Sequence, residues 1–185
     1  MKQNAKRALS LLLALMMLCS LCVNALAVNE VKVNATLDKN EITTSSEPQT
    51  VKVTIAPETA LTVCNYGMTS FQLPEGWTIA AIENDDPNAI LAAGDVVLDT
   101  GNISWMTDDM ENVTVSKLAI YTITVPADVE PGSYTLTANK IVAGKDYAAV
   151  WVLQDVSPSV TLTVKDNTPA AVGYTLSLIH ISEPT

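Results

Sequence analysis

Two short acidic runs are the segments of this chain whose side chains could hold a metal ion. Their members are Glu83, Asp85 and Asp86 in the first run and Asp108, Asp109 and Glu111 in the second. Calcium takes about six to eight oxygen ligands, often from a carboxylate-rich loop together with backbone carbonyls. Neither run has the spacing of the common calcium-binding loop, so solvated turns are the main alternative. We keep Asp108, Asp109 and Glu111 as weak calcium candidates and predict no other cofactor.

Catalysis finds little support in the residue types. Paired carboxylates can hydrolyse glycosidic bonds, but nothing in the sequence brings the two acidic runs together. Cys64 would need a base such as histidine to act as a nucleophile. The only histidine, His180, lies in a C-terminal segment that is set aside below. A buried, inert Cys64 is the simpler interpretation, and we predict that the chain is not an enzyme.

Aromatic residues could bind sugars, because flat exposed rings stack on aromatic side chains. The candidates are Trp77, Trp105, Trp151, Phe71, Tyr66, Tyr121, Tyr134 and Tyr147. Trp105 and Trp151 lie between apolar strand residues, which predicts core packing. Trp77 follows a turn, which predicts partial exposure. A stacking platform therefore stays open without being indicated.

The N-terminus has the three parts of a secretory signal peptide. Lys2, Lys6 and Arg7 are basic, Ala8–Val23 is apolar, and Ala25-Leu26-Ala27 ends in the small residues that a signal peptidase needs. We predict a signal peptide over residues 1–27 and a secreted, extracellular protein, with no membrane insertion after cleavage. The alternatives are an uncleaved anchor, for which the apolar run is short, and a lipoprotein modified at Cys19 or Cys22.

The C-terminus carries a segment of foreign character. Leu176–Thr185, LSLIHISEPT, matches residue for residue the translation of a transposase adapter used to prepare sequencing libraries. We treat residues 176–185 as an artefact, the alternative being a short strand with a polar tail. Residues 166–175 then read as a linker or the start of a next module. The natural chain is expected to continue past this point, and the missing part is a candidate for attachment to the cell surface.

The charge and cysteine content exclude some classes of partner. The chain has 10 basic and 20 acidic residues, a formal net charge of −10. Setting aside Lys2, Lys6, Arg7 and Glu183 leaves an even more acidic remainder, which repels nucleic acid and anionic membranes. Cys64 is then the one remaining cysteine, so no intramolecular disulfide can form.

Alternating β-branched and aromatic residues dominate the rest of the chain. They predict strands at Val31–Leu37, Thr50–Ile55, Leu61–Leu73, Trp77–Ile82, Val96–Leu98, Asn102–Met106, Lys117–Val125, Ser133–Lys140, Tyr147–Leu153 and Ser159–Val164. One weakly helical patch is expected at Asn84–Gly94. Many short strands with almost no helix predict an all-β fold, an antiparallel β-sandwich of about nine strands of jelly-roll type.

The segment Lys117–Thr137 gives the strongest pattern. Ala119, Tyr121, Ile123 and Val125 share one face of a strand, and Pro131-Gly132 punctuates before the alternation resumes. We read it as a β-hairpin. Its turn would place Tyr121 and Tyr134 on neighbouring strands, with one or both in the core.

This segment resembles the late strands of cohesin modules, secreted β-sandwiches that bind dockerins. In that family a strand of the form L-A-x-I-x-F-x-V precedes an acidic turn and x-P-G-x-Y. Tyr66–Leu73 resembles the G-x-x-x-F-Q-F strand, Asn102–Thr107 a strand before an acidic segment, and Ser159–Val164 the closing strand. The chain departs from the family at Pro74–Trp77, where a Y-D-P turn is more usual. The likeness covers most of residues 31–164.

The resemblance implies that residues 28–165 form a cohesin-like β-sandwich, an extracellular, non-catalytic module that binds a dockerin-like protein within a larger secreted or cell-surface protein. The alternatives are a carbohydrate-binding module whose partner is a polysaccharide, and a structural spacer repeat. The family's binding face is not carried by a short motif, so no binding residue can be transferred.

Overall fold

The alternation seen in the sequence builds two stacked sheets. A computed structural model describes residues 31–86, 96–107, 110–146 and 149–167. The smaller sheet has the order β1-β3-β10-β6. Its strands are β1 (Val33–Leu37), β3 (Gln49–Pro57), β10 (Ala119–Val125) and β6 (Thr78–Glu83).

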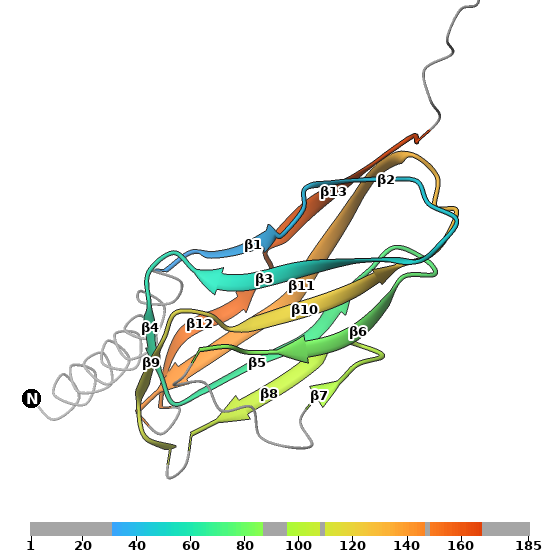
Figure 1. The fold of residues 1–185 in the computed structure, drawn as a ribbon. Coiled ribbons are helices and arrows are strands. Elements are labelled where there is room, and N and C mark those ends of the chain that lie inside the picture. Colours follow the sequence, from blue (N-terminus) through green and yellow to red (C-terminus); the bar gives the residue numbers. More distant parts are fainter. Residues whose placement is uncertain (1–30, 87–95, 108–109, 147–148, 168–185) are drawn as a thin grey trace, which may run out of the picture.

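The larger sheet has the order β2-β13-β11-β5-β8-β7, with β12 also paired to the long strand β11. Its strands are β2 (Glu41–Thr43), β13 (Ser159–Lys165), β11 (Gly132–Lys145), β5 (Asn65–Gln72), β8 (Asn102–Met106), β7 (Val96–Val97) and β12 (Val150–Val156). The short ribbon of β4 (Leu61–Val63) and β9 (Val113–Val115) lies at one end of the sandwich, and the β2–β13 pair lies at the other (Figure 1).

The predicted all-β sandwich is confirmed, with corrections in its detail. The described residues hold thirteen strands where about nine were expected. The three-residue strands β2 and β9 were missed, and the predicted strand Leu61–Leu73 is two strands, β4 and β5. The β2–β13 pair is parallel, whereas every other strand pair in this part of the chain is antiparallel. The predicted helical patch falls mostly on residues 87–95, outside the described residues.

The predicted hairpin over Lys117–Thr137 is wrong. Its two strands exist, but β10 belongs to the smaller sheet and β11 to the larger one. The six residues between them carry the chain from one layer to the other. Alternation fixes which residues face inward, but the same alternation suits a hairpin within one sheet and a crossing between two.

The core lies between the two sheets and is rich in aromatic side chains. Tyr121 of the smaller sheet stacks on Phe71 of the larger, with ring centroids 4.4 Å apart. The Tyr121 hydroxyl donates to the Gly101 carbonyl at 3.0 Å. Gly101 has a φ of 70°, and a Cβ there would stand 2.5 Å from the Phe71 Cβ, so this turn requires glycine. The predicted burial of Tyr121 is confirmed.

Tyr134 differs from Tyr121, although both had been placed in one hairpin. Tyr134 is half-buried, with its ring 5.1 Å from that of Trp77, and its hydroxyl donates to the Glu130 carbonyl at 2.7 Å. Trp77 itself is buried. The expectation that Trp77 would be partly exposed is therefore wrong, because Tyr134 covers it from β11.

The residues that the structure describes include no helix long and apolar enough to span a membrane. The predicted signal peptide, the C-terminal artefact and most of the linker (residues 1–27, 176–185 and 168–175) lie outside those residues and stay predictions.

Candidate functional site

The first acidic run is held by interactions within the chain. The Asp86 carboxylate accepts hydrogen bonds from the Ser116 backbone N–H at 2.6 Å and from the Ser116 hydroxyl at 2.8 Å. Asp85 forms an ion pair with Lys117 at 2.7 Å. These contacts fix the segment after β6 against the segment before β10. The run therefore serves to position the chain, which sequence alone could not show across about thirty residues.

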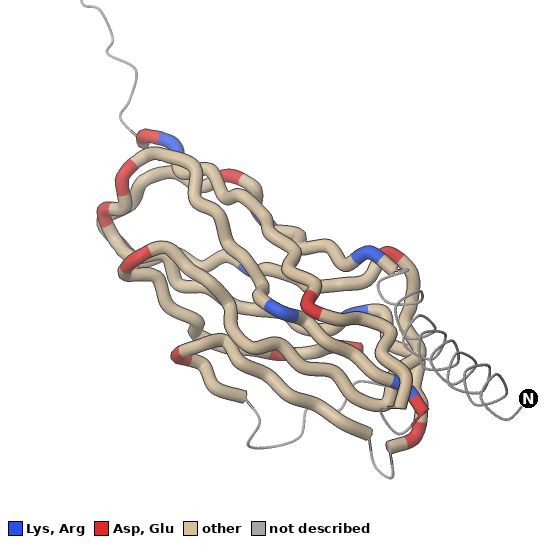
Figure 2. Tube along the Cα trace, turned by 180° about the vertical axis from the view of Figure 1, so that it is seen from behind, with Lys and Arg blue, Asp and Glu red and all other residues tan. Residues whose placement is uncertain are grey.

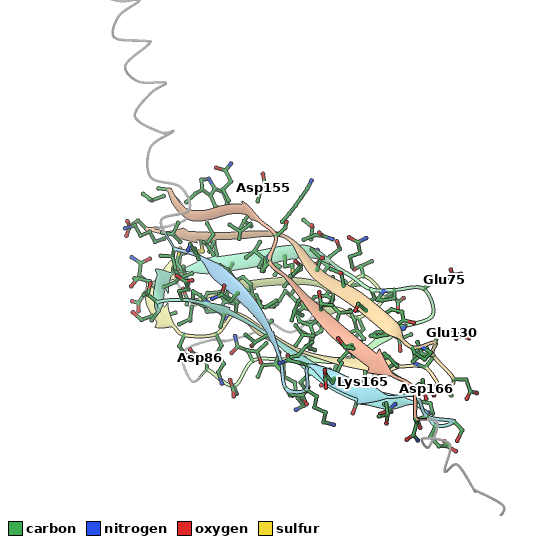
Figure 3. All side chains as sticks on the ribbon, turned by 90° about the horizontal axis from the view of Figure 1, so that it is seen from above. Glu75, Asp86, Glu130, Asp155, Lys165 and Asp166 are labelled. Atoms are coloured by element: carbon green, nitrogen blue, oxygen red, sulfur yellow. The ribbon has the colours of Figure 1, made fainter. Side chains whose placement is uncertain are left out.

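The weak calcium candidates gain no support. Asp108 and Asp109 lie outside the described residues, and Glu111 is exposed. No group of three or more metal-ligating side chains occurs in the part of the chain that the structure describes. Figure 3 shows Glu75, Glu130 and Asp166 near one end of the sandwich and Asp86 toward the other. The labelled acidic residues are thus spread over the molecule.

Cys64 is buried and unpaired, as expected for a small apolar core residue. Its backbone N–H donates to the Gly144 carbonyl at 2.8 Å, and its carbonyl accepts from the Thr107 N–H at 2.9 Å. The thiol therefore lies at a point where neighbouring segments are joined, without access to solvent.

The outer face of the larger sheet is the surface with the character of a binding site. Strands β5, β7 and β8 contain no charged residue. The exposed large hydrophobic residues of the described chain all belong to this sheet or to the turn after β7, namely Val97, Leu98, Met106, Val150 and Trp151. In Figure 2 the charged residues of the molecule lie mainly at strand ends and in turns. We call the surface formed by Gly67, Val97, Met106, Val142 and Trp151 the apolar face.

The strand register brings the residues of the apolar face together. Met106 pairs with Asn65, Asn65 pairs with Gly144, and Gly144 pairs with Trp151, so these four form one row across four strands. In the next row, Gly67 pairs with both Ser104 and Val142. Paired residues of a sheet point to the same side, so two glycines lie between larger side chains.

A shallow hollow of about 150 Å³ results at this point. We call it the Trp151 hollow, and its lining is Asn65, Tyr66, Gly67, Ser104, Trp105, Met106, Val142 and Trp151. The Asn65 side-chain oxygen Oδ1 is buried in the wall without a hydrogen-bond partner. An unpaired buried acceptor is unfavourable, so a turn of the Asn65 amide toward the hollow would let this oxygen gain a bond from a ligand donor.

The exposure of Trp151 corrects the sequence interpretation. Trp151 was expected in the core because Val150 and Val152 flank it, but its side chain is 43% exposed. The pairing of β12 with β11 shifts register between Ile141 and Gly144, and this irregularity sets which residues of β12 face outward. Trp105, by contrast, is 2% exposed, as predicted.

The Tyr66 and Tyr121 hydroxyls lie in the dry interior beneath the apolar face. Burial raises the pKa of both phenols above the ordinary value of about 10, and Tyr121 also raises that of Tyr66. The Tyr66 hydroxyl donates to the Leu118 carbonyl at 2.6 Å. Both phenols therefore stay neutral and act as hydrogen-bond donors that join the layers.

Two further hollows lie at the sheet edges. One, of about 370 Å³, lies between β1 and the turn from β12 to β13. The other, of about 410 Å³, lies beside β2 and contains Glu41 and Lys165. Those two side chains already form an ion pair at 2.6 Å. Neither hollow has an exposed aromatic ring.

Comparison with solved structures finds cohesin modules over most of the chain. The cohesin module of a family 33 glycoside hydrolase from Clostridium perfringens ATCC13124 has a TM-score of 0.51 and 10% identity, and covers 74% of this chain and 98% of that one. The third ScaB cohesin of R. flavefaciens, in complex with a group 1 dockerin, has a TM-score of 0.48 and 17% identity, covering 77% and 99%. A non-cellulosomal cohesin of the archaeon Archaeoglobus fulgidus has a TM-score of 0.47 and 14% identity, covering 72% and 91%.

The first of these similarities shows the fold. The two main sheets form a cohesin-like β-sandwich. No protein-family model and no curated protein sequence matches the chain. The likeness inferred from sequence is therefore confirmed as a likeness of structure.

Proposed function

We propose that this chain is an extracellular, non-catalytic binding module that docks a dockerin-like protein partner through its apolar face. The sequence resemblance gives the class of partner, and the predicted signal peptide gives the location. The cohesin-like fold supports the resemblance. The module would act within a larger secreted or cell-surface protein.

One observation carries the proposal. The exposed large hydrophobic residues gather on one sheet of a strongly acidic protein, and three strands of that sheet, β5, β7 and β8, hold no charged residue. Single exposed hydrophobic residues need no explanation, but a shared face of them marks an interaction site. Protein interfaces have a core that is depleted in charge and enriched in tryptophan and methionine. The apolar face has both properties.

The test is binding of the purified protein to a panel of immobilised dockerin modules, measured by surface plasmon resonance. We expect one or more dockerins to bind. Met106→Asp places a charge on the apolar face, and we expect it to weaken binding by about 30-fold, equivalent to about 2 kcal/mol, as for an interface residue that contributes strongly to binding. Thr50→Asp, an exposed position on the smaller sheet, is the matched control and should bind as the parent does.

Equal loss in both variants, or no loss in Met106→Asp, would place the interface elsewhere. If no dockerin binds, the protein-docking function fails. Of the two functions that need no sugar ligand, dockerin binding and a structural spacer, only the spacer then remains.

A further inference from the structure

Trp151 is the one tryptophan of this chain that offers its ring to solvent. The sequence contains three tryptophans, and Trp77 and Trp105 are 6% and 2% exposed. Trp151 is 43% exposed and forms one wall of the Trp151 hollow. An exposed indole beside a hollow presents a flat apolar surface together with nearby polar atoms.

Gly67 leaves the floor of the hollow without a side chain, although the fold does not require glycine at this position. Gly67 has no left-handed backbone conformation, and a Cβ added there would meet only the Ile103 carbonyl oxygen at 3.4 Å and a Val142 methyl at 3.8 Å. The fold would accept a larger residue at this position. Glycine in a strand interior often marks a place where a ligand approaches the backbone closely, and Gly67 fits that role.

The walls combine apolar and polar groups. Met106 and Val142 supply apolar contacts, and Ser104 is exposed beside them. Asn65 contributes the buried oxygen Oδ1 that has no partner. A ligand suited to these walls has a flat apolar surface and hydroxyl groups at its edge, which can bond to the exposed Ser104 hydroxyl and, once the Asn65 amide turns toward the hollow, to Asn65.

We propose that the Trp151 hollow binds one pyranose ring of a neutral polysaccharide, stacked on the Trp151 indole. The volume of about 150 Å³ is half of the roughly 300 Å³ at which drug-sized pockets begin, so the hollow takes one ring while the rest of the polysaccharide runs over the uncharged strands β5 and β8. The acidic net charge disfavours uronic acids and sulfated sugars. This proposal does not depend on a dockerin partner.

The test uses cellohexaose, xylohexaose, mannohexaose and chitohexaose as neutral probes and polygalacturonate as an anionic one. Because the other two tryptophans are buried, quenching of the intrinsic fluorescence by acrylamide reports mainly on Trp151. We expect at least one neutral hexasaccharide to bind with a dissociation constant of about 1 mM or tighter and to protect the fluorescence from acrylamide quenching. Polygalacturonate is expected to leave it unchanged.

Three variants locate the site, with binding read by affinity electrophoresis or calorimetry. Trp151→Ala should weaken binding at least tenfold, and Trp151→Phe should retain part of it. Gly67→Thr fills the floor with a residue that strands favour, and should lose binding while its melting temperature stays that of the parent. Thr122→Ala, on the opposite sheet, should bind normally.

Absence of binding by all four neutral probes overturns the proposal, as does unchanged binding in Trp151→Ala and Gly67→Thr. Preference for polygalacturonate overturns the neutral character of the ligand. If the Trp151 variants lose a dockerin while no sugar binds to the parent, the hollow belongs to the protein interface and the sugar site is rejected.

Discussion

The two sheets pack similar apolar inner faces into a shared core, but their outer faces differ: one is polar and the other is apolar. The outer face of the smaller sheet carries threonines, which we call the threonine face, at Thr36, Thr50, Thr54, Thr122 and Thr124. It also bears Lys52 and Glu83, 3.9 Å apart and both well exposed. The larger sheet instead presents the uncharged apolar face.

The contrast separates what the fold needs from what it does not. Threonine is β-branched and polar, so it favours a strand and remains soluble on an exposed face. The smaller sheet shows that such a surface suffices for this sandwich. The apolar face therefore exceeds the requirements of folding, which is the physical ground for assigning it a binding role.

The largest effect is expected between the faces, in the core that both sheets share. Tyr121→Ala removes a fully buried ring, its stacking on Phe71 and its hydrogen bond to Gly101. We expect a loss of about 3–5 kcal/mol in the free energy of unfolding, measured in urea. Tyr134→Ala removes a half-buried ring at the sheet edge, and we expect about 1–2 kcal/mol.

Equal costs for the two variants would contradict the difference in burial. That difference also revises the sequence interpretation, in which Tyr134 shared a hairpin with Tyr121 and one or both rings were expected in the core. Because β10 and β11 lie in different sheets, there is no reason to expect the two tyrosines to be equally buried.

The sequence predicted the two faces of β10 well and strand partners poorly. Alternation correctly put Ala119, Tyr121, Ile123 and Val125 on one face, which is the buried one. It could not decide whether the chain turns back or crosses to the other layer after Val125, because both paths keep the same residues inward. The three-residue strands β2 and β9 are too short to show a period.

The candidate site was missed for a related reason. Its residues come from β5, β8, β11 and β12, and only the register between these strands aligns Met106 with Trp151. The signal available in the sequence was the absence of charge from residues 61–73 and 102–106, in a chain with 20 acidic residues. The irregular pairing of β12 that exposes Trp151 has no sequence motif.

The loss of stability at alkaline pH tests whether water is excluded equally from the buried tyrosine hydroxyls of both sheets. Tyr66 of the larger sheet and Tyr121 of the smaller have pKa values raised by burial, so they ionise more easily in the unfolded chain. Stability is therefore unaffected below pH of about 10 and falls above it, by up to about 1.4 kcal/mol per pH unit for each phenol.

Urea unfolding between neutral pH and pH of about 11 measures this slope. Tyr66→Phe is the sharpest variant, because the Leu118 carbonyl keeps its hydrogen bond from the Asn84 side chain at 2.9 Å. Its slope should be shallower than that of the parent. An unchanged slope would mean that water reaches the Tyr66 hydroxyl.

The smallest effect on stability is expected from replacing exposed apolar residues of the larger sheet by threonine, the residue typical of the smaller sheet. Met106→Thr and Trp151→Thr give the larger sheet the surface that the smaller sheet already has. Both side chains are about half exposed, so each change should shift the free energy of unfolding by about 0.5 kcal/mol or less, as is usual for surface substitutions. Thermal unfolding of the double variant measures the sum.

The binding role of the apolar face is tested by comparing this small change in stability with the change in binding of the same double variant. If the apolar face is there for a ligand, the double variant melts close to the parent while both protein and sugar binding are weakened. If it melts far below the parent, Met106 and Trp151 stabilise the sandwich themselves, and the difference between the faces reflects packing. Thr54→Val on the threonine face is the matched control, since it adds apolar surface opposite the site and should create no binding.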